Sequence, residues 1–371
     1  MKVLILSHTY VVETNRKKVL KLSEFEDVDI SVITPKKWRH ELDTYKNESE
    51  GSLEVIPLKT FFNGRSYIHF YSNLHKYYTE INPDILHIEE EPWSISAFQG
   101  IGFKRENEDC KSLFFTWENI EKEHFPPFSF IENYVFEYSD RAISGNQEGK
   151  KVLRNKGYNK PVDVLPQLGV DPDIFQSRDC SELEEKLNLT EFTIGFVGRL
   201  IREKGLLTLL RSVLKLEDEF RVLFLGRGDF KKDLQKEAKD LGIRDKTVFV
   251  DTVPHDEVPR YLNCMDCLVL PSITTSNWKE QFGHVLIEAM ACEVPVIGSD
   301  SGAIPEVIED SGLVFEEADI DDLLDKIKLL MSDENLREDL AKKGRKRVLN
   351  NYTWEKIAEK TRDIYDELIS F

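Results

Sequence analysis

The chain has 371 residues, of which 40% are hydrophobic and 32% charged, and its formal net charge at pH 7 is −18. This balance excludes wholesale disorder, and the acidic net charge argues against a general nucleic-acid-binding protein. No apolar run reaches the roughly eighteen residues of a membrane-spanning helix, and the length favours two domains.

Short β-branched runs alternate with amphipathic helical stretches, which is the pattern of α/β proteins with parallel sheets. In the first half, helices are expected at Ser66–Ile81 and Gln147–Lys156. Strands are expected there at Val3–Ser7, Val28–Thr34, Leu53–Pro57, Ile85–Ile88, Ser112–Thr116, Arg141–Ser144 and Val162–Leu165.

The second half restarts the same alternation. Strands are expected at Phe192–Val197, Arg221–Leu225, Thr247–Val250, Cys267–Leu270, Pro295–Gly298 and Leu313–Phe315. Helices are expected at Lys204–Lys215, Lys231–Leu241, Gly283–Cys292, Ile320–Met331 and in the segment Asn335–Phe371.

The segment from Gln167 to Thr190 carries Gly, Pro and charged residues without clear periodicity, so we place the linker there. The sequence therefore predicts an N-terminal domain at 1–178 and a C-terminal domain at 179–353. Thr353 is a good N-cap for a last helix at 354–371, which packs either on its own domain or back onto the first.

Cysteine usage and the N-terminus bear on the cellular compartment. Cys264 and Cys267 form a lone C-x-x-C at the start of an apolar strand, so buried thiols are favoured over metal or redox chemistry. The segment Met1 to Tyr10 lacks a long apolar core and a cleavage site. We expect a cytoplasmic protein, with peripheral contact at the inner face of a membrane left open.

The segment from Lys279 to Glu306 is the most informative. Gly283 opens a helix, where free backbone amides and the helix dipole favour an anion, and a small residue lets a diphosphate approach the backbone. Glu280 precedes this helix and Glu288 lies within it, so that one carboxylate can accept from ribose hydroxyls and the other from sugar hydroxyls. Taken alone, the pattern also fits two surface acids beside an amphipathic helix.

This segment resembles the donor-site signature of retaining GT-B glycosyltransferases, in particular family 4. Glu-x-Phe-Gly, a second Glu, Ala-Met-Ala, a Pro-Val strand and Gly-x-x-x-Glu all occur in that order. The resemblance implies two Rossmann-like domains facing each other across a cleft, with the donor held mainly by the C-terminal one. It implies donor contacts at Gly198, Phe282, Gly283, His284, Val285 and Glu288.

A second segment supports the resemblance. Arg199 and Lys204 follow a predicted strand, so they place two cations at the carboxyl edge of a parallel sheet, where α/β proteins bind ligands. The resemblance implies that both contact the donor diphosphate. Alone, these residues also fit a solvated loop. Leu168–Phe175 and Asp266–Ser272 match further segments of the family.

The N-terminal half departs from the family pattern. Many members have a Gly-rich turn after the first strand, but Ser7–Asn15 contains no Gly. Many also have a His after a central strand, where this chain has Trp117 and Glu118. We therefore place Glu118 on the acceptor side, as a catalytic candidate beside Glu280, Arg199 and Lys204. Trp117 and His87 are further acceptor-side candidates, although a strand-end His also fits simple packing.

The sequence leaves the roles of two charged clusters open. Glu89, Glu90 and Glu91 could clamp a metal, but consecutive acids on an extended chain point different ways, and the resemblance implies a metal-independent enzyme. No metal ligand is assigned, and no cofactor is expected beyond a nucleoside diphosphate sugar as co-substrate. The run Lys36–Arg39 fits an acidic acceptor, lipid headgroups or a solvated loop.

The sequence predicts a glycosyltransferase that moves a sugar from a nucleoside diphosphate sugar to a glycan, a glycolipid or another acceptor, with retention of configuration. One alternative is a nucleotide-sugar epimerase or oxidoreductase, but that class needs a G-x-G-x-x-G turn, of which Gly226-Arg227-Gly228 is only a fragment. The other is a non-catalytic sugar-nucleotide-binding protein, against which the presence of Glu280, Arg199 and Lys204 argues.

Overall fold

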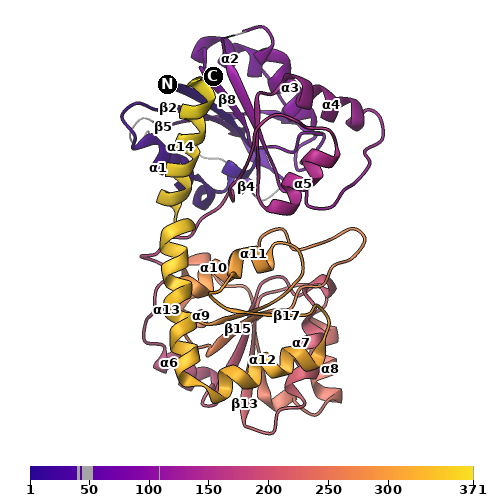
Figure 1. The fold of residues 1–371 in the computed structure, drawn as a ribbon, viewed down its shortest axis with the longest axis vertical. Helices are drawn as coiled ribbons and strands as arrows, with labels where there is room; N and C mark the ends of the chain where they lie inside the picture. The colour runs from indigo at the N-terminus through magenta and orange to yellow at the C-terminus, as the bar shows by residue number, and fades with distance from the viewer. Residues whose placement is uncertain (40–41, 44–52, 108, 371) are drawn as a thin grey trace. The chain divides into compact units, whose positions relative to one another are not determined.

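The structure is a computed structural model that describes residues 1–39, 42–43, 53–107 and 109–370. The chain forms two compact units, which are described separately below. Unit 1 comprises Met1–Gly169 and Trp354–Phe371, and unit 2 comprises Val170–Thr353. Each unit is built around its own parallel sheet with helices packed against it (Figure 1). Phe371, the predicted end of the last helix, lies outside the described residues.

The sheet of unit 1 has the strand order β11-β10-β9-β8-β1-β2-β5 among the described residues. Each neighbouring pair in this sheet is parallel. The strands are β1 (Lys2–Leu6), β2 (Asp29–Pro35), β5 (Leu53–Leu58), β8 (Ile85–Ile88), β9 (Lys111–Thr116), β10 (Arg141–Ser144) and β11 (Val162–Val164). The helices are α1 (Lys17–Ser23), α2 (Leu74–Ile81), α3 (Ile95–Lys104), α4 (Phe128–Tyr138), α5 (Gln147–Asn155) and α14 (Trp354–Ser370).

Alternating apolar residues build one core on each face of this sheet, because successive side chains of a strand point to opposite faces. Val3 and Ile5 belong to a cluster that includes Tyr365 of α14. Leu4 and Leu6 belong to the other cluster, which includes residues of α2, α3 and α4. The central strands are therefore covered on both sides, as buried parallel sheets require.

Two short antiparallel pairs accompany this sheet. The first joins β3 (Lys37–Trp38) to β4 (Leu42–Asp43), and the second joins β6 (Thr60–Phe61) to β7 (Phe70–Tyr71). The helix predicted at 66–81 is wrong in its first half, since β7 lies there and α2 begins only at Leu74. The aromatic residues of this segment pair with β6 instead of continuing a helical face; the rings of Phe61 and Phe70, for example, stack 4.8 Å apart.

The sheet of unit 2 has the order β14-β13-β12-β15-β16-β17 and is also parallel throughout its described pairs. Its strands are β12 (Phe192–Val197), β13 (Phe220–Leu225), β14 (Thr247–Val250), β15 (Cys267–Leu270), β16 (Val296–Ser299) and β17 (Leu313–Phe315). Its helices are α6 (Ser181–Leu187), α7 (Leu206–Val213), α8 (Lys231–Asp240), α9 (Val258–Leu262), α10 (His284–Ala291), α11 (Ile304–Ile308), α12 (Ile320–Ser332) and α13 (Glu334–Asn351). The prediction of two Rossmann-like α/β units is confirmed.

The segment after Gly169 belongs to unit 2, so the unit boundary differs from the predicted one at residue 178. The backbone N–H of Val170 donates to the carbonyl of Tyr352 at 2.9 Å. The guanidinium of Arg345 donates to the carbonyls of Pro172 and Phe175. These bonds fix residues 170–175 against the end of α13.

The last helix packs on unit 1. Ile357 and Tyr365 of α14 are fully buried in the cluster with Val3 and Ile5. Arg141 joins this helix electrostatically, since its guanidinium donates to Glu367 at 2.6 Å while it also pairs with Asp163. Of the two packings open for residues 354–371, the structure therefore has the one on the first unit.

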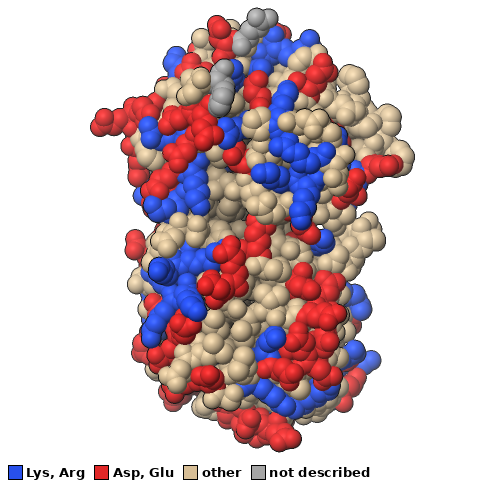
Figure 2. All heavy atoms as spheres, in the orientation of Figure 1, with Lys and Arg blue, Asp and Glu red and all other residues tan. Residues whose placement is uncertain are grey.

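No helix in the described part of the chain combines the length and the apolar character that crossing a bilayer requires. On the face shown in Figure 2, acidic and basic side chains are interspersed over both units. Neither unit presents a uniformly basic surface on this face, in keeping with the acidic net charge of −18. The cytoplasmic location stays a prediction.

Candidate functional site

Each sheet reverses its strand order at one place, and several of the candidate residues lie there. In unit 2, β13 and β14 extend the sheet on one side of β12, whereas β15, β16 and β17 extend it on the other. In unit 1 the reversal lies between β1 and β8. In open α/β sheets, the loops at the carboxyl ends of the two strands flanking such a reversal form the ligand crevice.

In unit 2, Lys204 and Glu280 meet at this reversal. Nζ of Lys204 lies 2.5 Å from Oε2 of Glu280, and the two side chains are 13% and 10% exposed. The hydroxyl of Ser272 donates to the same carboxylate oxygen at 2.7 Å. Ser272 follows β15 and Lys204 follows β12, so neighbouring strands supply the partners of Glu280.

Glu288 lies on α10, where two histidines hold its buried carboxylate. Nε2 of His255 is 2.7 Å from Oε1 of Glu288, and Nδ1 of His284 is 3.0 Å from the same oxygen. Burial opposes ionisation of Glu288, but the charge of His284 and the hydrogen bonds from His255 and His284 outweigh it and lower the pKa of Glu288 to about 2. The Glu288 carboxylate is thus a fixed, ionised acceptor.

Two glycines allow close packing around Glu280, one against a side chain and the other against the backbone. Gly283 is the N-cap of α10 with φ of +76°, and a Cβ there would lie 2.8 Å from a side-chain carbon of Leu270. Gly302 has φ of +58°, and a Cβ there would lie 2.1 Å from the carbonyl oxygen of Glu280. Both positions favour glycine because L side chains avoid this left-handed region. The first turn of α10 therefore lies directly after the Glu280 loop.

The remaining donor-side candidates also lie in unit 2. Arg199 is exposed, and its side chain makes no hydrogen bond or ion pair with the described residues. Gly198, directly before it, has φ of +145°. Phe282 is buried, with its ring 5.6 Å from that of Tyr352, whereas Val285 is half-buried on the first turn of α10.

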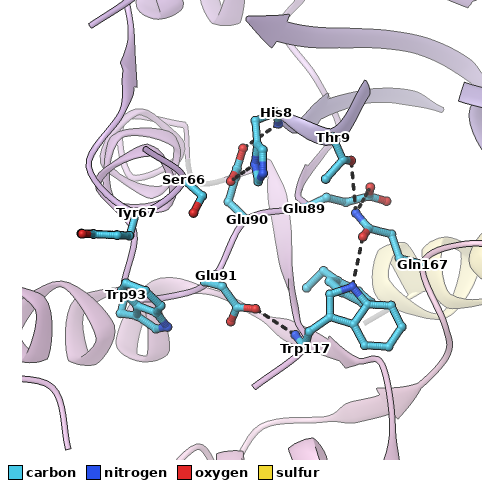
Figure 3. Close-up of a pocket in the computed structure, with 11 residues that line it drawn as sticks. His8, Thr9, Ser66, Tyr67, Glu89, Glu90, Glu91, Trp93, Trp117 and Gln167 are labelled. Carbon is cyan, nitrogen blue, oxygen red and sulfur yellow. Dashed lines mark hydrogen bonds and ion pairs between the residues drawn. The ribbon is translucent and has the colours of Figure 1, made fainter. Parts of the chain in front are cut away.

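Unit 1 contains a cavity of about 80 Å³ at its own sheet reversal (Figure 3). The loop after β1 supplies His8 and Thr9, and the loop after β8 supplies three glutamates. The complete lining is His8, Thr9, Ser66, Tyr67, Glu89, Glu90, Glu91, Trp93, Phe115, Trp117 and Gln167. The lining thus combines aromatic rings with hydrogen-bonding groups, and no Lys or Arg contributes to it.

The three consecutive glutamates have different partners. Glu89 pairs with Lys18 and accepts from Gln167 at 2.9 Å. Glu91 accepts from the hydroxyl of Thr116 at 2.6 Å. Burial raises the pKa of Glu91 to about 7 despite this bond. Glu90 is bound by histidines, as described below.

The structure places the three acceptor-side candidates, Trp117, His87 and Glu118, in different surroundings. Trp117 lines the cavity, and its indole N–H donates to Gln167 at 3.2 Å (Figure 3). His87 is buried beneath the sheet edge, where Nδ1 lies 2.7 Å from the hydroxyl of Tyr365. Burial lowers the pKa of His87 to about 4, so its ring is neutral. This is the packed strand-end histidine that the sequence allowed.

Glu118 does not line the cavity. Its carboxylate pairs with Lys156 at 3.0 Å, and Lys156 also binds Glu132 at 2.8 Å. His124 completes this cluster, with Nε2 3.3 Å from Glu118. Lys156 thus compensates the charge of Glu118 outside the cavity lining, and the acceptor-side role of Glu118 stays a prediction.

Among the described residues, two clusters contain residue types that bind metals. In the cluster of Glu118, His124 and Glu132, both carboxylates already bind the ammonium group of Lys156. In the second cluster, of His8, His69 and Glu90, Nδ1 of His8 lies 2.7 Å from Glu90. Two tetrahedral ligands of zinc, each about 2.1 Å from the ion, are roughly 3.4 Å apart, so 2.7 Å is the spacing of a hydrogen bond.

Two other sequence clusters have structural roles. Cys264 and Cys267 are buried, and the thiol of Cys264 donates to the carbonyl of Arg260 at 3.2 Å, which is the core position expected. Trp38 of the basic run 36–39 is buried against His8, with ring centroids 4.6 Å apart. Within this run, Trp38 therefore packs against a residue that lines the cavity.

Sequence reasoning missed several residues of both sites. His255 and Ser272 were not singled out, although each follows a strand whose carboxyl end faces the candidate site. His8 and Gln167 were likewise passed over. The signal that would have found His8 is its position directly after the first strand, where the reversal between β1 and β8 follows from the topology.

Comparison with known proteins supports the assignment from geometry. Residues 179–347 match the family model described as glycosyl transferases group 1. The chain is 31% identical over 238 residues to the capsular polysaccharide biosynthesis glycosyltransferase CapM of Staphylococcus aureus, which covers 62% of this chain and 61% of that protein. It is also 31% identical over 212 residues to the GDP-mannose-dependent alpha-(1-6)-phosphatidylinositol monomannoside mannosyltransferase of Mycobacterium tuberculosis (strain H37Rv). This match covers 54% of this chain and 55% of that protein. The chain thus spans about half to three fifths of the length of these relatives.

Solved structures share the fold of the whole chain. Sucrose-phosphate synthase from Thermosynechococcus elongatus matches with a TM-score of 0.74 at 19% identity, over 100% of this chain and 99% of that one. The HepE protein of Anabaena in complex with UDP matches with a TM-score of 0.77 at 16% identity, over 99% and 100%. The fold expected from the sequence is confirmed, since it is that of the GT-B glycosyltransferases. Residues 179–347 are similar to the glycosyl transferases group 1 family, which agrees with the expected resemblance.

Proposed function

We propose that this protein is a glycosyltransferase of the hexosyltransferase type, which moves a sugar from a nucleoside diphosphate sugar to an acceptor with retention of configuration. The observation that carries the proposal is the convergence of Lys204, Glu280 and Ser272 at the strand reversal of unit 2. A nucleoside diphosphate sugar needs both cations for its phosphates and carboxylates for its hydroxyls, and this site supplies both.

The leaving diphosphate gains negative charge as the glycosidic bond breaks. Arg199 and Lys204, with the amides at the start of α10, stabilise that charge without a metal ion. Glu288, held ionised by His255 and His284, accepts hydrogen bonds from the ribose. Glu280 stands beside the sugar and stabilises positive charge at the anomeric carbon. No cofactor is required beyond the donor itself.

The acceptor binds in the cavity of unit 1. Its lining combines the rings of Tyr67, Trp93 and Trp117 with the polar groups of Thr9 and Gln167. Aromatic faces pack against sugar rings while hydroxyls bond to carboxylates and amides, so a neutral glycan end suits this cavity better than a phosphate or carboxylate. The names of relatives support a glycan or lipid-linked acceptor, since CapM is named for capsular polysaccharide biosynthesis and the mycobacterial enzyme for a phosphatidylinositol mannoside.

The proposal is tested in two steps on the full chain. A thermal-shift screen of UDP-, GDP- and ADP-sugars first identifies the donor, which raises the melting temperature by binding only the folded state. Release of the nucleoside diphosphate is then measured with and without neutral glycan and glycolipid acceptors. An epimerase or oxidoreductase changes the sugar without releasing nucleotide, and a binding protein releases none, so either result contradicts a transferase.

A further inference from the structure

Two segments of unit 1, residues 36–39 and 59–65, lie side by side at the carboxyl edge of its sheet. They follow β2 and β5, which are neighbouring parallel strands with Pro35 in register with Leu58. The side chain of Asn63 joins the two segments, because Nδ2 donates to the carbonyl of Lys37 and Oδ1 accepts from the N–H of Arg39, both at 2.7 Å. The two segments therefore form one continuous piece of surface.

This piece of surface carries positive charge that no acid compensates. Four exposed side chains make no ion pair or hydrogen bond with the described residues, namely those of Lys36, Arg39, Lys59 and Arg65. Lys37 is in register with Asp43 of β4 and is not counted with them. No acidic residue occurs at 35–39 or 58–65. The positive charge is local, since the net charge of the chain is −18.

Two exposed phenylalanines lie beside these cations. Phe61 and Phe62 are 46% and 59% exposed. Phe61 stacks on Phe70 of β7 at 4.8 Å, and Nζ of Lys59 lies 5.7 Å from the centre of the Phe61 ring. The backbone is left-handed at Phe62, with φ of +53°, and at Arg39, with φ of +55°. Bulky side chains avoid this region, so the surrounding structure holds both residues in conformations that they would not adopt by themselves.

We infer that this basic–aromatic surface docks unit 1 on an anionic lipid bilayer. The surface is made of Lys36, Arg39, Lys59, Phe61, Phe62 and Arg65. Its cations meet the phosphates of the headgroups, and its two exposed rings enter the boundary between headgroups and acyl chains. The acidic remainder of the chain does not prevent this, because physiological salt largely screens exposed charges more than about 8 Å apart. Binding here needs neither donor nor acceptor, so it goes beyond the proposed function and does not depend on it.

A bilayer fits this surface better than an acidic polymer does. An acidic polysaccharide would use the cations but would leave the two phenylalanine rings in water. Nucleic-acid bases stack on open aromatic faces, but the Phe61 ring already packs on Phe70 and lies under the ammonium group of Lys59. A bilayer uses both kinds of group, because its phosphates lie directly above its apolar region.

The surface continues into the lining of the unit 1 cavity. Arg65 directly precedes Ser66 and Tyr67, which both line the cavity (Figure 3). In the other segment, the ring of Trp38 packs against His8 of the same lining, with centroids 4.6 Å apart. A bilayer bound at this surface therefore lies beside the cavity. If the proposed function holds, this suits an acceptor that is anchored in the same bilayer.

The test is co-sedimentation of the full chain with lipid vesicles, without donor or acceptor. Vesicles of phosphatidylcholine and phosphatidylglycerol in equal parts should pellet the wild-type protein, and vesicles of phosphatidylcholine alone should pellet little of it. Arg39→Gln and Arg65→Gln should each lower partition to the anionic vesicles about fivefold, which corresponds to about 1 kcal/mol for each cation near the surface. Phe61→Ser and Phe62→Ser should each lower it roughly tenfold, because an apolar ring no longer leaves water.

Lys151 and Ile369 offer matched controls in unit 1. Lys151 is an exposed cation of α5 without an ion pair among the described residues, and Ile369 is 44% exposed on α14. Lys151→Gln and Ile369→Ser should bind the anionic vesicles as the wild type does. Salt at about 1 M should release most of the wild-type protein, because the screening length then falls to about 3 Å.

Two results would overturn the inference. One is wild-type protein that does not bind the anionic vesicles, or binding that survives all four substitutions in the surface. The other is binding of single-stranded RNA or heparin that the same substitutions abolish, without binding to vesicles, which would make the partner an acidic polymer. Circular dichroism checks the folding of each variant, and Arg65→Gln decides alone if the phenylalanine variants do not fold. Sugar transfer is measured separately, so a failure of the proposed function leaves the vesicle result standing.

Discussion

The ammonium group of Lys204 lies 2.5 Å from a carboxylate oxygen of Glu280, although the two residues are 76 positions apart in the chain. Glu280 also accepts a hydrogen bond from the hydroxyl of Ser272, so two side chains hold the carboxylate. A cation assigned to phosphate and an acid assigned to the sugar are therefore one coupled unit. Arg199 has no such partner among the described residues, and this difference separates the expected effects of removing each cation.

Arg199→Ala and Lys204→Ala should both slow transfer by roughly 100- to 1,000-fold, because each removes a charge that stabilises the leaving diphosphate. Only Lys204→Ala should also destabilise the fold, by roughly 2–4 kcal/mol, since it leaves the largely buried Glu280 carboxylate without its cation. The measurements are kcat at saturating donor and urea unfolding of each variant. Near wild-type rates in both variants would contradict the phosphate assignment, and equal stability of both would contradict the coupling.

Replacing each of the two donor-side glutamates should change a different kinetic constant. Glu288→Gln should mainly raise the donor KM, because the ribose contact is made in the ground state and the transition state alike. Glu280→Gln should mainly lower kcat, because a carboxylate beside the anomeric carbon matters most when positive charge develops there. Steady-state kinetics with varied donor distinguish the two. Both variants keep the shape of the side chain and remove its charge.

Two other outcomes are informative. Unchanged kinetics in both variants would make these residues ordinary structural acids and would remove the basis of the transferase proposal. A reversed pattern would keep the enzyme class and exchange the two roles. Glu106→Gln is the control for glutamate-to-glutamine substitution, since Glu106 is an exposed acid of unit 1 that pairs only with His75 in the described hydrogen bonds and ion pairs.

Transfer should survive excess EDTA. In the proposed mechanism Arg199, Lys204 and the start of α10 stabilise the charge of the leaving diphosphate. The Glu280 carboxylate is bound by Lys204 and Ser272. We would measure product formation after dialysis against chelator, with and without added Mg²⁺ or Mn²⁺. Activity lost on chelation and recovered with either ion would show that the proposed metal-independent mechanism is wrong.

Glu288 should give a stability contribution that depends on pH. Its pKa is about 2 in the folded protein and near 4.5 unfolded, so the unfolded state binds its proton first as the pH falls. The contribution is complete above about pH 4.5, amounts to about 3 kcal/mol there, and is lost as the pH falls from about 4.5 to about 2. Urea unfolding of wild type and Glu288→Gln should therefore show a gap in stability at pH 5 that narrows toward pH 2.5. A gap independent of pH would contradict this assignment.

Most of the fold could be read from the sequence because apolar β-branched runs form the buried strands of both sheets. The runs around Val3, Val32 and Ile194 are each buried and have a paired strand on both sides. The segment 66–81 could not be read in this way. Its first half is rich in aromatic residues, and whether they continue a helix or pair with β6 depends on a partner strand outside the segment.

Contacts between residues close in the chain could be predicted from the sequence, whereas contacts between distant residues could not. His284 and Glu288 are one helical turn apart, so their contact follows from the helix alone. His255 reaches the same carboxylate from 33 positions away, and His8 reaches Glu90 from 82. Only the order of strands brings these pairs together, and a single sequence does not state that order. Glu118 shows the converse, because its neighbour Trp117 lines the cavity while its own side chain joins Lys156.

The path of the chain makes unit 2 an insertion within unit 1. The chain leaves unit 1 after Gly169 and re-enters it at Trp354, and the two ends of unit 2 are hydrogen-bonded, with the N–H of Val170 donating to the carbonyl of Tyr352 at 2.9 Å. Because entry and exit are adjacent, residues 170–353 form a cassette that could be cut out and transplanted with both ends joined at one point. Unit 1, in contrast, is complete only after the ribosome has synthesised the cassette, since α14 supplies Ile357 and Tyr365 to its core.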